Sequence, residues 1–189
     1  MTNEEHAALR SELTRLRKER VQSEFGAIPA SVEYLKKLLD SDSSEDNRQT
    51  LYPLLLSESS RSKNDALHLH WLRRRAHDLP EDPLSISGLG FGLVTTQPPS
   101  SKEALSLAER ALELAKVQDR QVRYCATNLA RIALILDDYE ALDRALSTLV
   151  ADAGKDRSED QCYEFDFVGQ IDPRRCNREV FARYKAMQP

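Results

Sequence analysis

The sequence predicts an all-α protein, folded as a right-handed α-solenoid of antiparallel helix pairs. Apolar residues recur three and four positions apart from Leu9 to Tyr184, which is the period of an amphipathic helix. Aromatic residues make up 6% of the chain and there are six glycines, a composition that favours helices over sheets. The breaks between apolar segments are short, so consecutive helices must fold back on one another. An irregular helical bundle is the alternative fold.

Residues 1–46 are expected to form N-terminal helices that pack on the solenoid. The first helix, over residues 3–24, carries Leu9, Leu13 and Leu16 as a narrow apolar seam. Such a seam either docks on neighbouring helices or pairs with another chain. Docking is favoured because fewer than about three heptads rarely sustain a coiled coil.

Two further helices are expected over residues 30–40 and 48–59, because both segments have apolar residues at helical spacing. The polar segment between them, residues 41–46, indicates a helix stop followed by an N-cap. Pro53 lacks a backbone N–H, so we expect it in the first turns of its helix.

The helix expected over residues 63–78 holds the chain's histidine cluster. His68 and His70 are two positions apart and point in different directions on a helix, whereas His70, Arg74 and His77 share one face. Arg74 lies between the two histidines on this face, and its positive charge would repel a metal ion. We therefore predict a solvated basic face with its tryptophan partly in the core, and as the functional alternative a patch for an anion or an acidic partner.

The segment at residues 84–96 is apolar and contains three alternating glycines. Asp82 and Pro83 before it are typical of a helix start, with the aspartate as cap and the proline as first residue. The segment lacks the lysine and hydroxyl residue of a phosphate loop. We predict a helix packed closely between its neighbours, with a strand or a ligand-binding loop as the alternative.

The stretch from Ser100 to Val150 shows the helical period most clearly. It contains three amphipathic helices, interrupted at Asp119 and at Asp137-Asp138. Alanine dominates the first two apolar stripes and lets a neighbouring backbone come close. The stripes are Ala104, Leu105, Ala108, Ala111, Leu112 and Ala115; then Ala126, Leu129, Ala130, Ala133, Leu134 and Leu136; then Leu142, Leu146, Leu149 and Val150.

One short pattern recurs at an interval of about 38 residues. SKNDALHL begins at Ser62, SSKEALSL at Ser100 and DYEAL at Asp138. Over residues 47–152 the chain resembles the tetratricopeptide (TPR) family, in which helix pairs repeat and the Asp-Tyr-Glu-Ala of residues 138–141 commonly opens the second helix. The resemblance implies a solenoid whose first helices line a concave surface that binds peptides or helices.

Residues 153–189 are expected to form capping helices with segregated charge. Acidic residues dominate from Asp152 to Asp166, where Lys155 and Arg157 are the only basic residues. Arginines dominate the last helix, which we expect to open at Asp172-Pro173.

Composition excludes some classes of function. The net charge of −4 gives no general attraction to nucleic acid or to an anionic membrane. No apolar run is long enough for a transmembrane helix and the N-terminus is acidic, so we expect a cytoplasmic protein with no membrane partner. The cysteines at 125, 162 and 176 are far apart, and Cys125 is expected to be a core residue. No cofactor, metal or catalytic residues are predicted.

We expect a protein–protein interaction module, monomeric or a weak homodimer. The resemblance implies that the residues facing its groove, which would bind a protein or peptide partner, are Arg48, Leu51, Tyr52 and Leu55 in one unit and Tyr124, Thr127, Asn128 and Arg131 in the next. Arginine and asparagine there suit an acidic or carboxylate-bearing peptide.

Two other functions remain open from the sequence. An immunity protein that neutralises a basic toxin through an acidic surface, with Asp160 and Glu164 in contact, would explain the small acidic chain. An enzyme is the less favoured class, because no motif supplies its chemistry.

Overall fold

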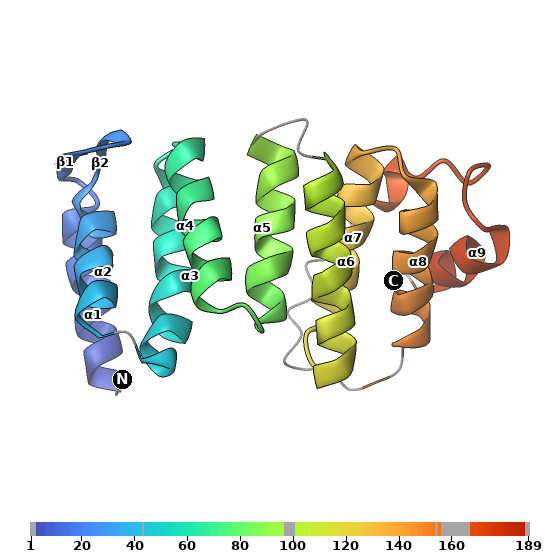
Figure 1. The fold of residues 1–189 in the computed structure, drawn as a ribbon, viewed down its shortest axis with the longest axis horizontal. Coiled ribbons are helices and arrows are strands. Elements are labelled where there is room, and N and C mark those ends of the chain that lie inside the picture. Colours follow the sequence, from blue (N-terminus) through green and yellow to red (C-terminus); the bar gives the residue numbers. More distant parts are fainter. Residues whose placement is uncertain (1–2, 43, 97–100, 154, 156–166, 188–189) are drawn as a thin grey trace. The chain divides into compact units, whose positions relative to one another are not determined.

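The computed structural model describes residues 3–42, 44–96, 101–153, 155 and 167–187, and the chain divides into two compact units, Met1–Arg75 and Ala76–Pro189. In these residues the chain is predominantly helical, and a short two-stranded hairpin supplies the strand content (Figure 1). The prediction of an all-α protein is confirmed at this level. The boundary between the units lies inside a helix and coincides with neither expected domain boundary.

The N-terminal unit begins with a helix whose apolar seam is buried. Leu9, Leu13 and Leu16 are 6%, 1% and 8% exposed, and their helix α1 packs against α2, so the prediction that the seam docks within the chain is confirmed. The elements of this unit are α1 (Asn3–Leu16), β1 (Arg20–Ser23), β2 (Gly26–Pro29), α2 (Ala30–Ser41), α3 (Glu45–Arg61) and most of α4 (Asp65–Asp78).

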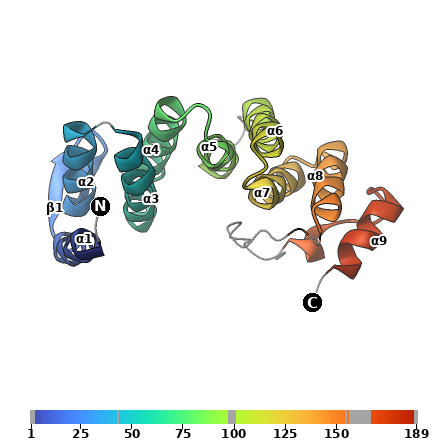
Figure 2. The same cartoon turned by 90° about the horizontal axis from the view of Figure 1, so that it is seen from below.

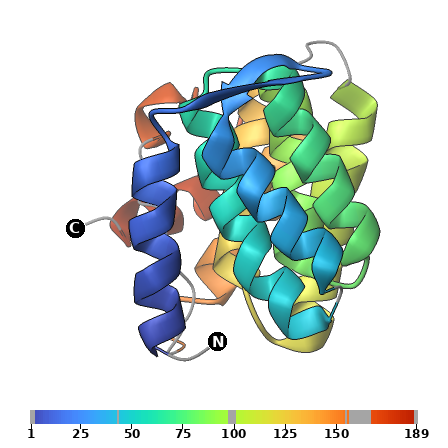
Figure 3. The same cartoon turned by 90° about the vertical axis from the view of Figure 1, so that its left-hand side faces the viewer.

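A β-hairpin replaces the end of the predicted first helix. Strands β1 and β2 are antiparallel, with Arg20 opposite Pro29, and they connect α1 to α2 at one end of that pair (Figure 3). Gly26 has φ +85°, a conformation that glycine adopts without strain, and the hydroxyl of Ser23 donates to its carbonyl oxygen. The expectation of a helix over residues 3–24 was therefore wrong after Leu16, where the chain turns into this hairpin.

The start of α3 confirms one prediction and corrects another. Ser44 caps the helix by accepting a hydrogen bond from the backbone N–H of Asn47, so the polar segment at 41–46 is a helix stop followed by an N-cap. The cap lies so early that Pro53 is in the middle of α3 and not in its first turns. Because Pro53 is exposed, water can hydrate the backbone carbonyl that lacks its helical N–H partner there.

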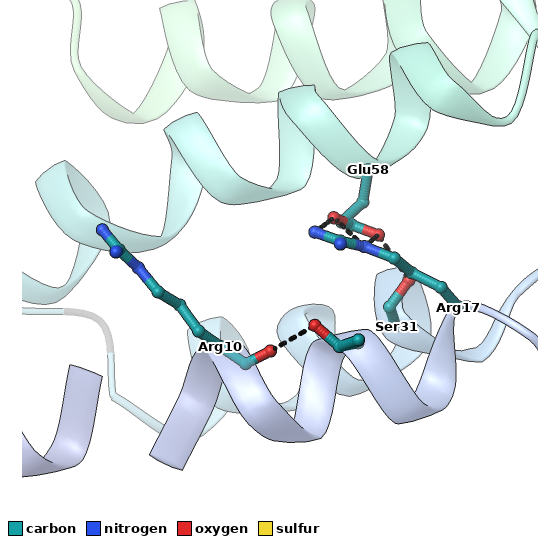
Figure 4. Close-up of polar contacts among 5 residues, drawn as sticks. Arg10, Arg17, Ser31 and Glu58 are labelled. Carbon is teal, nitrogen blue, oxygen red and sulfur yellow. Dashed lines mark hydrogen bonds and ion pairs between the residues drawn. The ribbon is translucent and has the colours of Figure 1, made fainter. Parts of the chain in front are cut away.

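The carboxylate of Glu58 connects three helices of the N-terminal unit. It is 2% exposed and accepts bonds of 2.6 to 3.0 Å from Arg17, just after α1, and of 2.9 Å from the hydroxyl of Ser31 in α2 (Figure 4). Within α1, the hydroxyl of Thr14 donates to the carbonyl oxygen of Arg10 at 2.9 Å. The guanidinium and the hydroxyl together satisfy the buried carboxylate.

The C-terminal unit is built around small residues in closely packed helices. Helix α5 packs against α6 and α7, α6 against α7, α7 against α8, and α8 against α9 (Figure 2). These elements are α5 (Pro83–Thr96), α6 (Ser101–Gln118), α7 (Val122–Ile135), α8 (Tyr139–Ala151), η1 (Val168–Gln170) and α9 (Arg178–Ala186). The completely buried small residues of α6, α7 and α8 are Ala104, Ala108, Ala111, Ala115, Cys125, Ala126, Ala130, Ala133, Ala141 and Ala145.

The glycine-containing segment forms helix α5, so a strand or ligand loop is excluded at residues 84–96. Asp82 caps it by accepting from the N–H of Ser85, as the sequence predicts. A Cβ on Gly90 would lie 2.9 Å from the backbone oxygen of Ala104 and 3.5 Å from the nitrogen of Ala108. The glycine therefore permits the close approach of α5 to α6.

The last helix starts later than predicted. Asp172-Pro173 lies in a turn, and α9 begins at Arg178, where the side chain of Asn177 accepts from the N–H groups of Glu179 and Val180. The carboxylate of Asp143 in α8 accepts from the backbone N–H of Asn177. This tertiary contact and a better capping residue place the start five positions further on.

We expect Gly90→Ala to lower the free energy of unfolding by about 1–3 kcal/mol, because the new methyl group meets backbone atoms that cannot move alone. This loss exceeds the gain of about 1 kcal/mol in helix propensity. Chemical denaturation measures it, with Gly169→Ala as the control because a Cβ there meets nothing within 4 Å. An unchanged midpoint for Gly90→Ala would show that the two helices separate easily.

Candidate functional site

Ser59 and His68 form the arrangement that most resembles a catalytic pair. The Oγ of Ser59 lies 2.9 Å from Nδ1 of His68 and 3.1 Å from the carbonyl oxygen of Leu56. If Ser59 donates to Leu56, it accepts from the imidazole, and the histidine then cannot act as its base. Ser59 is also completely buried, so no substrate reaches its hydroxyl. The pair joins α3 to α4.

The histidine cluster of α4 is solvated only in part: His68 and His70 are half-buried among neighbouring side chains, whereas His77 is exposed. The ring of His70 lies 5.0 Å from that of Phe25 and 5.1 Å from that of Trp71. Arg74 lies over the Trp71 ring and pairs with Asp40 at 2.6 Å. Trp71 is 2% exposed, so it is more deeply buried than predicted. Among the described residues no three histidine, cysteine, aspartate or glutamate side chains gather to hold a metal ion.

The described cysteines are buried. Cys125 is completely buried and its thiol lies 3.8 Å from the carbonyl oxygen of Pro83, which confirms its place in the core. Burial raises the pKa of Cys176 to about 11, so its thiol stays protonated at neutral pH and is a poor nucleophile. Cys162 lies outside the described residues.

The structure places only one of the predicted α3 contact residues near the surface. Tyr52, Leu51 and Leu55 are buried, so they belong to the core, and their assignment to the exposed concave surface of a solenoid was wrong. Arg48 is half-buried. A helix in the middle of a unit is covered on several sides, and periodicity does not reveal how many.

The predicted row on α7 is exposed only in part. Tyr124 and Arg131 are half-buried, whereas Asn128 is 5% exposed and donates to the hydroxyl of Ser87 in α5 at 2.9 Å. Asn128 is therefore an interhelix link and not a partner contact. Thr127 is also buried, and the row ends at Ile135, which is 53% exposed.

Helix α5 carries a matching row that the sequence analysis missed. Its partly exposed residues have the spacing of positions 124, 128, 131 and 135 on α7, moved by 40 residues. The bond from Asn128 to Ser87, the neighbour of Gly88 in the α5 row, joins the two rows where the helices pack together. We call this surface the α5–α7 face; its residues are Leu84, Gly88, Phe91, Thr95, Tyr124, Arg131 and Ile135. The equal spacing was the signal that could have found it.

The charged residues after α8 begin with a paired aspartate. Asp152 is 3% exposed, and its carboxylate lies 3.4 Å from Arg123 and 3.3 Å from Lys155. It lines a hollow of about 360 Å³ with Lys116, Lys155, Asp119 and the side chains of α8. Asp152 is thus structural. Asp160 and Glu164, the predicted contacts of an acidic inhibitor surface, lie outside the described residues.

A larger groove lies in the N-terminal unit, between α1, α2 and α3. Its volume is about 470 Å³ and its charged lining is acidic. We call it the α1–α2–α3 groove; it is lined by Glu5, Ala8, Leu9, Glu12, Tyr34, Leu38, Ser41, Asp42, Asn47 and Leu51. Sequence reasoning missed it because its residues come from three helices whose relative positions the pattern does not give.

The chain matches no protein-family model, no curated protein and no solved structure. Along the described part of the chain, no helix combines the length and apolar character needed to cross a bilayer. We therefore infer the function from the surfaces described above.

We expect the protein to lose stability as the pH falls from about 7 to about 5. Burial lowers the pKa of His68 and of His70 in the folded protein, so the unfolded chain, with an imidazole pKa of about 6.5, takes up protons first. The resulting loss of stability is absent above the unfolded pKa and grows as the pH falls below it. Urea unfolding at several pH values measures the slope. His68→Asn with His70→Gln should flatten it; an equal slope in the original protein and this variant would contradict the assignment.

Proposed function

We propose that the protein is a non-enzymatic protein–protein interaction module, built as a TPR-like right-handed α-solenoid. The intervals between its helices support the repeat. Helices α3, α5 and α7 begin at Glu45, Pro83 and Val122, and α4, α6 and α8 at Asp65, Ser101 and Tyr139. These starts are 36 to 39 residues apart, close to the period of the sequence pattern.

The packing inside the C-terminal unit also supports a repeat architecture. In a solenoid the first helix of one pair contacts its own partner and the first helix of the next pair. Helix α5 packs against both α6 and α7, and α6 packs against α7. The small residues along these contacts keep the helices close enough for α5 and α7 to present one continuous surface.

The observation that carries the proposed function is the α5–α7 face. It combines partly exposed apolar side chains, Phe91 and Ile135 among them, with Tyr124 and Arg131. Interfaces are enriched in aromatic residues and arginine, which supply apolar contact and directed hydrogen bonds together. We infer that this face binds a peptide or helix that offers an apolar anchor and a carboxylate for the arginine.

We expect Arg131→Ala and Ile135→Asp each to weaken partner binding by about 1–3 kcal/mol and to leave the fold nearly unchanged, because both side chains reach the surface. A pull-down from the cells that encode the protein supplies the partner. Titration calorimetry of the recovered partner then measures binding, alongside thermal melts.

Ala133→Arg is the control for folding, because Ala133 is completely buried in α7 and a charge there should unfold the unit. The proposal fails if both surface variants bind normally while Asp160→Ala with Glu164→Ala abolishes binding. That result would favour the acidic immunity or inhibitor protein.

A further inference from the structure

The α1–α2–α3 groove has an apolar floor. Leu9 and Leu51 are buried at its base, while Leu38 and Tyr34 are half-buried and reach its surface. Ala8 is exposed on the α1 side and contributes only a methyl group to the lining. Its volume of about 470 Å³ lies within the range of about 300–1,000 Å³ that is usual for binding pockets.

The charged side chains that line this groove all have the same sign. They are Glu5, Glu12 and Asp42, and no lysine, arginine or histidine is among the lining residues. Arg15, outside the lining, pairs with Glu12 at 2.7 Å and lowers its pKa, while the backbone N–H of Ser44 lowers the pKa of Asp42. Both carboxylates are therefore ionised at neutral pH.

The helix ends around the groove add further negative charge. Glu4 lies in the first turn of α1, and Glu45 and Asp46 lie in the first turn of α3. Arg15 offsets the charge of Glu12, but the excess of carboxylates around the groove still raises the local concentration of cations and repels phosphate. The groove thus disfavours nucleic acid, and its apolar floor gives no advantage to a small hydrated ion.

The groove is preorganised by contacts at both of its ends. The Glu58 carboxylate ties the end of α1 and the start of α2 to α3. At the other end, the amide of Asn47 donates to the carbonyl oxygen of Asp42 at 2.7 Å, which fixes the corner between α2 and α3. A preorganised site loses less conformational entropy when a ligand binds.

From this geometry we propose that the α1–α2–α3 groove docks a basic amphipathic helix of a partner protein, with leucine-like side chains on the floor and lysine or arginine on the acidic rim. Helix-in-groove binding uses apolar anchors at intervals of three and four residues, and the flanking charges set the specificity. This site lies in the N-terminal unit and is separate from the α5–α7 face.

The test uses a fluorescein-labelled synthetic peptide of about four helical turns, with leucines at positions i, i+4, i+7 and i+11 and lysines at most other positions. Fluorescence anisotropy measures its binding to the full-length protein. A second peptide with serine in place of leucine keeps the charge and removes the anchors. We expect it to bind at least about tenfold more weakly, because only the first peptide can use the apolar floor.

The matched variants are Ala8→Arg and Ala7→Arg. Both residues are exposed on α1, but only Ala8 lines the groove, so both variants add the same charge to the same helix. Ala8→Arg should weaken the leucine peptide by about tenfold or more and Ala7→Arg by less than about threefold, with equal thermal melts. Glu5→Gln with Asp42→Asn should weaken it without blocking the floor.

Two results would overturn the docking site. Equal affinity of the leucine and serine peptides would show attraction to negative charge anywhere on the protein, and equal binding by the two alanine variants would place the peptide elsewhere. Because Arg131→Ala and Ile135→Asp lie in the other unit, their effect on the recovered partner reports on the α5–α7 face independently.

Discussion

The close contact between α5 and α6 is the constraint on which the C-terminal unit depends. Gly90 faces the backbone of Ala104. The buried alanines of α6, α7 and α8 likewise allow close contact between the other helices of the unit. Helices that pack through small residues gain dispersion contacts between their backbones, although each side chain buries little apolar area. This packing brings α5 and α7 side by side and so creates the face that we propose as a binding surface.

In the N-terminal unit, the buried charge of Glu58 is the main constraint on the packing of the helices. Removing the Glu58 carboxylate from water is costly, and only the guanidinium of Arg17 and the hydroxyl of Ser31, held in the right geometry, offset that cost. The ion pair therefore demands one arrangement of α1, α2 and α3.

The two surfaces differ in chemistry. The α5–α7 face offers aromatic and aliphatic side chains with Arg131 beside them, whereas the α1–α2–α3 groove offers aliphatic side chains under an acidic rim. Each thus suits a partner segment of the opposite charge. Three nucleophilic or titratable side chains outside these surfaces are used in packing: Ser59 and His68 join two helices, and Cys125 fills the core.

The sequence by itself determined where most helices lie, which faces they bury, and that Asp82 and Pro83 start α5, because these features depend on residues within one or two turns of each other. It did not determine the hairpin after α1, the burial of Tyr52, or the role of Asn128. Glu58 bonds with Arg17, and Asn128 with Ser87, and the two residues of each pair are 41 positions apart in the sequence. Only the tertiary structure decides such contacts, since they depend on how stripes of similar composition pack, and the same packing decides which part of each stripe remains at the surface.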